Sequence, residues 1–220
     1  MKREELLAMV DHTLLAQTAT WNEIRRICEE GQAFHTASVC IPPNFVRQAA
    51  EFLEGSVPIC TVEGFPNGYS EPEIKEGEAR LALEQGAQEI DMVISIGRLK
   101  EGRFDLVADE IRRLKDACGS HILKVIVETC LLTEEEKKQM CRTVTEAGAD
   151  YIKTSTGFSS GGATFEDVAL FQKYIGPGVK IKAAGGIRSF EDGERFVQLG
   201  ASRLGTSRLV GIMKEEGYGE

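Results

Sequence analysis

Two lysines stand where soluble proteins rarely place a charge. Lys153 follows the apolar pair Tyr151 and Ile152 and precedes a hydroxyl-rich turn that ends at Gly157. Lys182 ends a second apolar run, directly before two alanines and a glycine pair. Charged side chains are seldom buried in strand interiors unless they are paired. We therefore expect these two lysines to take part in chemistry.

A lysine is a nucleophile only as the free amine. At a reference pKa near 10.4, fewer than about one lysine in a thousand is unprotonated at neutral pH. Burial and a second ammonium group both favour the neutral form, and Lys182 is placed to be that second charge beside Lys153. A neutral Lys153 could attack an aldehyde and form a protonated imine, which draws electrons out of the adjacent carbon–carbon bond. The predicted chemistry is that of a Schiff-base aldolase.

Asp91 is the carboxylate best aligned to assist this cycle. Three Gly-Ala pairs each close a predicted helix before a strand, and the fifth residue after the glycine is Asp91, Lys153 or Gly205. In an eight-stranded barrel, alternate strands contribute to one interior layer. The three residues lie on the predicted fourth, sixth and eighth strands, so Asp91 and Lys153 should face the same interior layer near the barrel mouth. Asp91 could then move protons at the carbinolamine and the enamine, while Gly205 leaves room for a ligand. A structural ion pair between Asp91 and either lysine is the alternative.

Two other lysines are weaker candidates. Lys124 and Lys180 each lie near the start of a predicted strand, from which a long side chain can reach solvent. We expect neither of them in the site.

Strand-length apolar runs alternate with segments of helical period along the whole chain. Thr20, Thr133 and Ser189 are predicted to cap helices between the strands. Alternating strands and helices imply a parallel sheet, and eight units predict one (β/α)8 TIM barrel, an α/β fold, as a single domain over residues 1–220. A doubly wound open sheet is the alternative. The eight predicted strands are 9–13, 36–41, 57–62, 89–94, 122–127, 150–155, 179–184 and 202–205.

Glycines follow the last two predicted strands. Gly185 and Gly186 end the seventh strand, and Gly205, Thr206 and Ser207 end the eighth and open the last helix. Backbone N–H groups at these places, with a helix N-terminus, can hold a phosphate. A glycine pair alone is better explained by an ordinary turn. The two glycine motifs together predict a phosphate site.

The composition argues against several classes of partner. A formal charge of −9 without a basic run is not typical of a nucleic-acid surface. No stretch approaches the roughly 20 apolar residues of a membrane span, and the charged N-terminus has no apolar signal core. We expect a cytoplasmic protein that binds small molecules, neither nucleic acid nor membrane.

The cysteines and histidines do not indicate a metal site. The six cysteines form no CxxC pair, so neither a zinc site nor a disulfide framework is expected. His12, His35 and His121 lack metal-ligand spacing. Cys40 is read as a small buried apolar residue, and His12 as either a packing residue or a hydrogen-bond partner near Asp11.

Five segments, in this order, together resemble the deoxyribose-phosphate aldolase family over residues 11–207. They are Asp-His-Thr-Leu-Leu at 11–15, Glu-Gly-Phe-Pro-Asn-Gly at 63–68, Glu-Ile-Asp-Met-Val at 89–93, Lys-Thr-Ser-Thr-Gly at 153–157 and Lys-Ala-Ala-Gly-Gly-Ile-Arg at 182–188. The resemblance implies a barrel that interconverts 2-deoxy-D-ribose 5-phosphate with D-glyceraldehyde 3-phosphate and acetaldehyde, without metal or organic cofactor. It makes Lys153 the Schiff-base lysine, Lys182 the lysine that perturbs it, and Asp91 the carboxylate of the carbinolamine steps.

The same resemblance implies the substrate contacts. Asp11 and Thr13 match positions that line the pocket, and Cys40 matches a pocket cysteine. The family's phosphate-binding positions fall on Gly157, Gly185, Gly186, Gly205 and Ser207.

Two positions differ from the family's pattern. Phe158 stands where some relatives carry a lysine that would contact phosphate, so that charge comes from elsewhere or is absent; Arg188 or Arg208 could supply it, although surface arginines are the simpler interpretation. Tyr218 resembles the family's C-terminal tyrosine that folds over the pocket, yet two residues follow it.

Two alternative functions stay open from the sequence. One is a Schiff-base lyase that acts on another phosphosugar or on a keto acid. The other is a phosphosugar-binding barrel without catalysis, in which Lys153 pairs with Asp91. Barrels of this kind are often dimers, so a homodimer is possible, but no surface stripe in the sequence identifies an interface.

Overall fold

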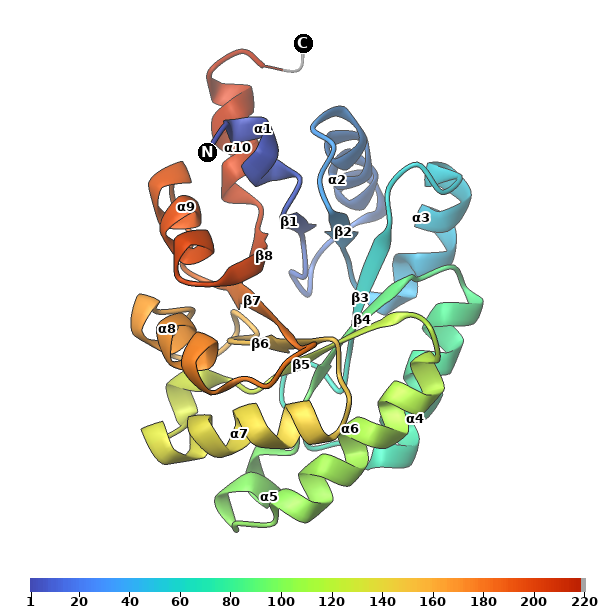
Figure 1. Ribbon diagram of the computed structural model, residues 1–220. Coiled ribbons are helices and arrows are strands. Elements are labelled where there is room, and N and C mark those ends of the chain that lie inside the picture. Colours follow the sequence, from blue (N-terminus) through green and yellow to red (C-terminus); the bar gives the residue numbers. More distant parts are fainter. Residues whose placement is uncertain (219–220) are drawn as a thin grey trace.

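The chain folds into a closed barrel of eight parallel strands surrounded by helices (Figure 1). The computed structural model describes residues 1–218. Each strand pairs with the next in sequence, and β8 pairs with β1. The predicted (β/α)8 barrel is thus confirmed, and the strand ends differ from the predicted ones by at most two residues. The strands are β1 (Val10–Thr13), β2 (Ser38–Cys40), β3 (Ile59–Glu63), β4 (Glu89–Val93), β5 (Ile122–Ile126), β6 (Tyr151–Lys153), β7 (Lys180–Ala184) and β8 (Ala201–Thr206).

Helices connect the strands and cover the outside of the barrel (Figure 1). Helix α1 precedes β1, and the short α5 is inserted between β4 and α6. Two 3₁₀ turns, η1 (Pro43–Phe45) and η2 (Thr129–Leu131), precede α3 and α7. The helices are α1 (Arg3–Leu7), α2 (Trp21–Ala33), α3 (Val46–Leu53), α4 (Pro72–Glu84), α5 (Ile96–Lys100), α6 (Phe104–Cys118), α7 (Glu134–Glu146), α8 (Phe165–Tyr174), α9 (Phe190–Gln198) and α10 (Arg208–Glu215).

The three predicted helix caps are present. The backbone N–H groups of Thr20 and Thr133 donate to the glutamates three residues later, at 2.8 and 2.7 Å, as in a capping box. The Ser189 hydroxyl accepts from the N–H of Asp192 at 3.1 Å. These caps satisfy backbone donors that would otherwise be unpaired in the first turn, so α2, α7 and α9 begin where the sequence predicts.

The strands present two chemically different faces. Outward side chains such as Val39, Ile90 and Ile152 are fully buried against the helices and form the main apolar core. The residues next to them in sequence point to the other face, because side chains alternate along a strand. Inside the barrel this places charged groups, including the fully buried Asp91 and Lys124. The barrel interior is therefore largely polar, which is expensive unless every charge is paired.

A second buried ion pair lies outside the barrel, between α4 and α6. Lys75 Nζ donates to the carbonyl oxygens of Gly68 at 2.6 Å and Val93 at 2.8 Å, and it lies 3.1 Å from Glu110 Oε2. Glu110 Oε1 accepts from the N–H of Ser95 at 2.7 Å. These bonds tie the loop after β3 to the end of β4, and they fix one wall of the barrel mouth.

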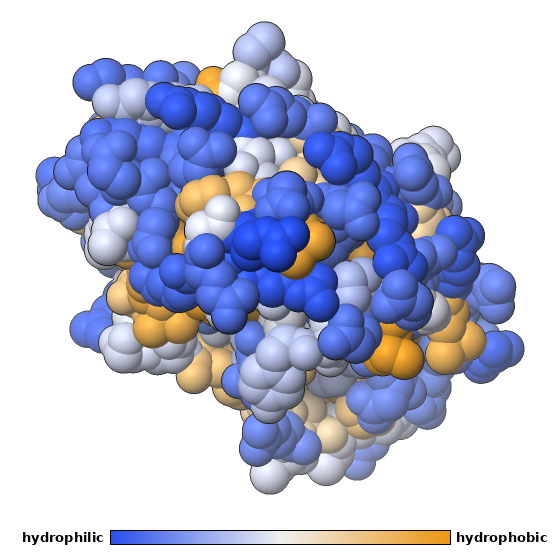
Figure 2. All heavy atoms as spheres, turned by 90° about the horizontal axis from the view of Figure 1, so that it is seen from below, coloured by the Kyte–Doolittle hydropathy of each residue, from blue (hydrophilic) through white to orange (hydrophobic). Residues whose placement is uncertain are grey.

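The surface is predominantly hydrophilic on the face shown in Figure 2. Apolar side chains appear there only as small separate patches, so that face offers no continuous apolar interface. Within residues 1–218, no helix combines the length and the apolar character that crossing a membrane requires.

Candidate active site

Asp91 lies at the centre of the barrel interior and is surrounded by three lysines. Its Oδ2 atom lies 2.7 Å from Lys153 Nζ and 2.6 Å from Lys182 Nζ, and its Oδ1 atom lies 2.9 Å from Lys124 Nζ. The four side chains come from β4, β5, β6 and β7. Strand pairing aligns these side chains. Asp91 on β4 lies opposite Lys124 on β5, and Lys153 on β6 lies opposite Lys182 on β7.

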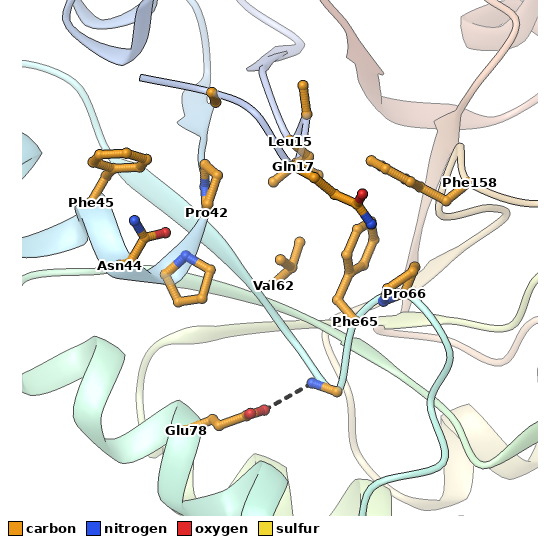
Figure 3. Close-up of a pocket in the computed structure, with 14 residues that line it drawn as sticks. Leu15, Gln17, Pro42, Asn44, Phe45, Val62, Phe65, Pro66, Glu78 and Phe158 are labelled. Atoms are coloured by element: carbon orange, nitrogen blue, oxygen red, sulfur yellow. Dashed lines mark hydrogen bonds between the residues drawn. The ribbon is translucent and has the colours of Figure 1, made fainter. Parts of the chain in front are cut away.

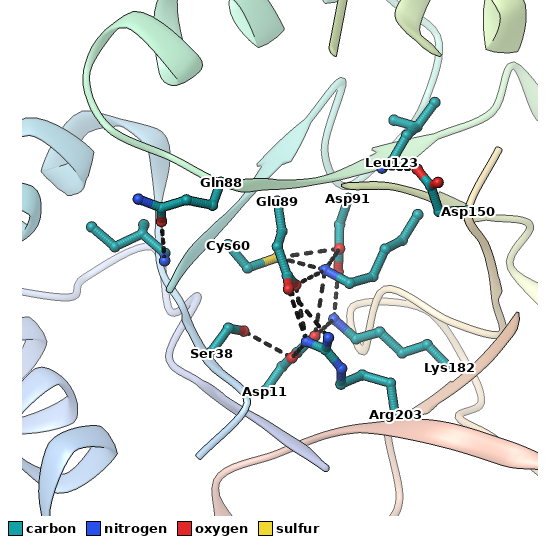
Figure 4. A network of polar contacts seen from close by, with 12 residues as sticks. Asp11, Ser38, Cys60, Gln88, Glu89, Asp91, Leu123, Asp150, Lys182 and Arg203 are labelled. Carbon is teal, nitrogen blue, oxygen red and sulfur yellow. Dashed lines mark hydrogen bonds and ion pairs between the residues drawn. The ribbon is translucent and has the colours of Figure 1, made fainter. Parts of the chain in front are cut away.

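The network continues towards the strand starts (Figure 4). Asp11 Oδ2 lies 2.5 Å from Lys182 Nζ, and Asp11 Oδ1 accepts from Ser38 at 2.8 Å and from Arg203 at 2.5 Å. Arg203 also contacts Glu89, whose Oε2 lies 2.5 Å from Lys124 Nζ. Acidic and basic groups thus alternate through this network, and each of its charges has an opposite neighbour.

This arrangement sets the charge states of the interior groups. Burial alone would raise the pKa of Asp91, but Lys124, Lys153 and Lys182 outweigh it and hold that pKa well below its usual value. Burial alone would lower the pKa of Lys182, but Asp11 and Asp91 raise it above the usual value. Asp91 is therefore a carboxylate and Lys182 an ammonium at neutral pH.

The expectation for Lys124 was wrong. Lys124 is fully buried, and its pKa is raised well above the usual value because Asp91 and the other interior acids overcome the cost of burial. A lysine near the start of a strand does not reach solvent when its side chain points into a closed barrel. Lys180 is the first residue of β7 and is exposed, as expected.

The two barrel cysteines lie beneath the mouth of the barrel. Cys40 and Cys60 are fully buried and pack with Val62. Cys60 Sγ lies 3.2 Å from Asp91 Oδ1 and 3.3 Å from Lys124 Nζ. The Cys60 thiol and nearby carboxylates are close enough together to hold a metal ion, but the ammonium group of Lys124 already occupies the space between them. The donor set therefore does not fit a metal.

A cavity of about 600 Å³ opens at the carboxyl ends of the strands, and we call it the main cavity. Lys153 lines it, whereas Lys124 and Lys182 are not among its lining residues and are fully buried. Of the predicted substrate residues, Asp11 and Cys40 do not line it either: both are fully buried below. The predicted substrate residues that do line it are Thr13, Gly157, Gly185, Gly186, Gly205 and Ser207.

Glycine is required at two of these positions, at one because of the backbone conformation and at the other because neighbouring atoms lie too close for a side chain. Gly185 has a φ of 81°, a left-handed conformation that side-chain-bearing residues rarely adopt. At Gly205, an added Cβ atom would lie 2.9 Å from Ala184 Cβ and 3.2 Å from Lys182 Cε. Gly205 therefore allows Ala184 and Lys182 to pack closely against β8, and it also lines the main cavity.

The residues at which the chain departs from the family's pattern occupy different places. Phe158 is half exposed and lines the main cavity. Arg188 and Arg208 also line this cavity. Arg208 is ion-paired with Glu215 on α10, at 2.7 and 3.1 Å, so Arg188 is the arginine of this lining that is available to an anion in the cavity. Tyr218 is 52% exposed, lies beyond α10 and close to Arg3, and is not among the residues that line the main cavity. In this structure it does not fold over the cavity.

The sequence interpretation missed Glu128, which shapes the turn after Lys153. Glu128 follows β5, is 2% exposed, and adopts a left-handed backbone with φ of 55° although it is not glycine. Its Oε2 accepts from the Thr156 hydroxyl at 2.5 Å, and that hydroxyl accepts from the N–H of Phe158 at 3.0 Å. A carboxylate at the carboxyl end of a barrel strand is the signal that could have revealed it.

The fold and the site together define a class of protein: a (β/α)8 barrel with a buried lysine–carboxylate network below a cavity at the carboxyl ends of its strands. Residues 6–209 match the DeoC/LacD family aldolase description. The chain belongs to this aldolase family.

Several known proteins are similar to this chain along almost its whole length. Deoxyribose-phosphate aldolases of Streptococcus agalactiae and Streptococcus pyogenes are 58% and 59% identical, over 98% of this chain and 97% of each relative. Among solved structures, the aldolase QR15 has a TM-score of 0.91 at 36% identity, covering 96% of this chain and 95% of its own. The deoxyribose phosphate aldolase of Aeropyrum pernix, described as tetrameric, has a TM-score of 0.87 at 30% identity, covering 98% and 92%.

Proposed function

We propose that this chain is a class I aldolase that reversibly cleaves 2-deoxy-D-ribose 5-phosphate to D-glyceraldehyde 3-phosphate and acetaldehyde. One observation carries the proposal: of the three lysines around Asp91, Lys153 is the one that lines the main cavity. A substrate aldehyde can reach its amine, whereas Lys124 and Lys182 are enclosed below.

In the proposed reaction, Lys153 attacks the aldehyde carbon of the open-chain sugar, and water leaves the carbinolamine to give a protonated imine. The hydroxyl on the third carbon loses its proton, and the bond between the second and third carbons breaks. The bonding electrons move into the iminium and form an enamine on Lys153, while glyceraldehyde 3-phosphate departs. The enamine carbon then takes a proton, and water releases acetaldehyde.

Lys182 and Asp91 support this cycle from below. Lys182 is an ammonium that shares Asp91 Oδ2 with Lys153, so the two lysines compete for one carboxylate oxygen. Asp91, as a carboxylate within 2.7 Å of Lys153 Nζ, accepts and returns the protons of the carbinolamine steps. Asp11 holds Lys182 in place. Thr13 and Cys40 flank the reacting carbons, Thr13 at the cavity wall and Cys40 beneath it.

The phosphate is proposed to bind where β6, β7 and β8 end. The glycine turns at 157 and 185–186 and the Gly205–Ser207 segment line the main cavity, and α10 begins at Arg208. Their backbone N–H groups are the proposed phosphate donors. The guanidinium group of Arg188 supplies the positive charge that Phe158 does not, and Arg208 can add to it only by leaving Glu215, with which it is paired. The reaction as proposed uses no metal or organic cofactor, because the imine itself accepts the electrons.

Borohydride trapping tests the nucleophile. The protein is mixed with deoxyribose 5-phosphate or acetaldehyde, reduced, digested and mapped by mass spectrometry. We expect a stable adduct on Lys153 that is absent from Lys153→Leu. No adduct in a folded protein, or an adduct on Lys182 instead, would refute the assignment. Trapping in a Lys182→Met variant serves as the matched control, because it removes the neighbouring ammonium and keeps the nucleophile.

Two activity measurements separate this proposal from its alternatives. Faster cleavage of ketose phosphates or keto acids than of deoxyribose 5-phosphate would indicate a different Schiff-base lyase. A non-catalytic binding barrel would bind the sugar phosphate without turnover in the unmodified protein. The homodimer and the cytoplasmic location stay predictions. Because the Aeropyrum pernix aldolase is described as a tetramer, the number of subunits has to be measured separately for this chain.

A further inference from the structure

A small cavity adjoins the turn that follows β6. It has a volume of about 110 Å³, and Glu128, Thr156, Phe158 and Ser159 are among the residues that line it. We call it the Glu128 pocket. Phe158 lines this pocket, the main cavity and the cavity of about 370 Å³ shown in Figure 3. Because Thr156 also lines both the Glu128 pocket and the main cavity, the two spaces share the turn that contains Gly157.

Glu128 is a buried acid without a counter-charge in the described structure. It is 2% exposed, and no lysine, arginine or histidine of residues 1–218 forms an ion pair with it. The buried Glu63 differs, because burial raises its pKa to about 9 and it retains a proton. The buried acids that pair with lysine or arginine are Asp11, Glu89, Asp91, Glu110 and Asp167. An unpaired buried charge is costly, so a cation from solution would stabilise the Glu128 carboxylate.

Neutral oxygen atoms accompany the carboxylate in the lining of the Glu128 pocket. Asn67 donates its Nδ2 group to the Tyr69 hydroxyl at 2.8 Å, so its carbonyl oxygen can serve as a ligand. Ser159 adds a hydroxyl group, which lies 3.4 Å from Cys130 Sγ. Carboxylate, carbonyl and hydroxyl oxygens are the ligands that hard cations prefer. The volume of the pocket leaves room for a cation with a few water molecules.

The charge of the pocket favours a cation with a single positive charge. Glu128 is the charged side chain among the described residues that line it. One carboxylate balances one positive charge, whereas calcium sites usually combine several carboxylates. Glu128 also holds a left-handed backbone conformation, with φ of 55°. Such conformations cost energy in residues other than glycine, and they cluster where proteins hold ligands.

We propose that the Glu128 pocket binds a monovalent alkali cation such as K⁺, and that this cation strengthens the binding of phosphorylated substrate. The effect on substrate rests on the proposed function, whereas the binding of the cation does not. The cation takes no part in the bond changes at Lys153. It holds the Glu128 carboxylate, which in turn holds Thr156 and the turn containing Gly157. Its charge also offsets a carboxylate that would otherwise repel a phosphate in the main cavity.

Kinetics in two salts test the effect of the cation. Cleavage of deoxyribose 5-phosphate is measured in potassium chloride and in tetramethylammonium chloride at the same ionic strength, so that the anion and the screening are matched. KM should be lower in potassium chloride by about fivefold or more, the size of a typical coupling between two binding sites, while kcat changes little. The same KM in both salts would overturn the proposal.

Glu128→Gln removes the charge that the cation balances. The KM of this variant should be the same in potassium chloride and in tetramethylammonium chloride, because the amide does not attract a cation. Glu135→Gln, at an exposed place on α7, is the matched control and should keep the full response to K⁺. A response to K⁺ that persists in Glu128→Gln would place the cation elsewhere and contradict the proposal.

Ser159→Ala is a milder change to the same pocket. Ser159 is exposed, so the loss of its hydroxyl group leaves the packing of the barrel unchanged. Removing one neutral ligand should raise the K⁺ concentration that gives half of the effect on KM by about three- to tenfold. An unchanged K⁺ requirement in this variant would contradict the assignment of the cation to the Glu128 pocket.

Rubidium crystallography tests the site without any turnover. Rb⁺ replaces K⁺ in alkali-cation sites and scatters anomalously, so crystals soaked in rubidium chloride should show an anomalous peak beside the Glu128 carboxylate. The peak should be absent from crystals of Glu128→Gln. No peak beside Glu128 in the unmodified protein would overturn the proposal.

Failure of the cation site and failure of the proposed function give different results. If the proposed function is wrong, deoxyribose 5-phosphate is cleaved in neither salt, yet the rubidium peak beside Glu128 remains. If only the cation site is wrong, the sugar phosphate is cleaved with the same KM in both salts, and no rubidium peak appears in the Glu128 pocket.

Discussion

Lys153 Nζ lies 2.7 Å from Asp91 Oδ2 although the two residues are 62 positions apart in sequence and a whole strand, β5, separates theirs. The contact crosses the barrel interior, where both side chains are almost completely buried. Because Lys182 donates to the same oxygen at 2.6 Å, one carboxylate atom controls the charge around both lysines. The reactive amine is therefore part of a network and cannot be altered independently of it.

Asp91→Asn should abolish most of the activity and reduce stability. The variant keeps the shape of the side chain but removes the negative charge that three lysines share. We expect kcat to fall by about a hundredfold or more and the free energy of unfolding to fall by about 3 to 5 kcal/mol. Steady-state kinetics and urea denaturation at pH 7 measure the two effects. Retention of more than half of the activity would exclude a proton-transfer role for Asp91.

The same pairing predicts the response to acid. The pKa of Asp91 is lowered in the folded state, so its contribution to stability is complete above the unfolded pKa of about 3.9 and is lost as pH falls towards the lowered value. Urea midpoints measured between pH 5 and pH 2.5 should fall more steeply for the unmodified protein than for Asp91→Asn. Parallel curves would mean that other carboxylates dominate the acid transition.

Lys124→Met should destabilise the protein even though Lys124 does not line the main cavity. Its removal leaves Glu89 without its closest cation and Asp91 Oδ1 without its ammonium partner, and both carboxylates are buried. The expected loss in the free energy of unfolding is about 3 to 5 kcal/mol. Lys180→Met is the matched control: that lysine is exposed, and its replacement should change stability by less than about 0.5 kcal/mol. Similar denaturation midpoints for both variants would contradict the role given to Lys124.

Glu128→Gln should weaken the binding of phosphorylated substrate. The Glu128 carboxylate holds the hydroxyl and N–H of Thr156, which positions the turn containing Gly157. Replacing a charged acceptor with an amide should raise KM for deoxyribose 5-phosphate about tenfold. For unphosphorylated deoxyribose, KM should change little, whereas a general loss of structure would impair both substrates alike. Glu135→Gln, at an exposed place on α7, is the control.

Glu63→Gln should increase stability at alkaline pH. Glu63 is 1% exposed, and neither carboxylate oxygen has a hydrogen-bond partner in the described structure. Burial, with the nearby charge of Glu78, raises the pKa of Glu63 to about 9. The folded state thus retains a proton that the unfolded state releases above about pH 4.3, so stability declines as pH rises from there towards 9. The amide does not titrate, and it should gain about 2 kcal/mol or more over the unmodified protein at pH 8.5.

Urea denaturation of both proteins at pH 6 and pH 8.5 checks this sign. The difference in unfolding free energy between Glu63→Gln and the unmodified protein should grow with pH. A constant difference would show that Glu63 is already charged in the folded protein.

Much of the architecture could be predicted because it depends on local patterns. Apolar β-branched runs specify the strands, and Thr20, Thr133 and Ser189 specify where helices begin through bonds within one turn. The pairing of Lys153 with Asp91 could also be predicted, because strand register transfers directly to side-chain direction in a barrel. Lys124 and Glu128 could not: whether a charge near a strand end meets solvent or a carboxylate depends on strands remote in sequence.

The sequence by itself therefore determined the barrel, its eight strands, the two lysines with their carboxylate, and the glycines that line the main cavity. Only the tertiary structure decided which lysine faces that cavity, how the charges of Asp11, Glu89, Lys124 and Arg203 are paired, and that the rings of Phe65 and Phe158 pack edge-on. The physical reason is closure. Local sequence sets the direction of each side chain, but its neighbours across the barrel are known only when all eight strands are in register.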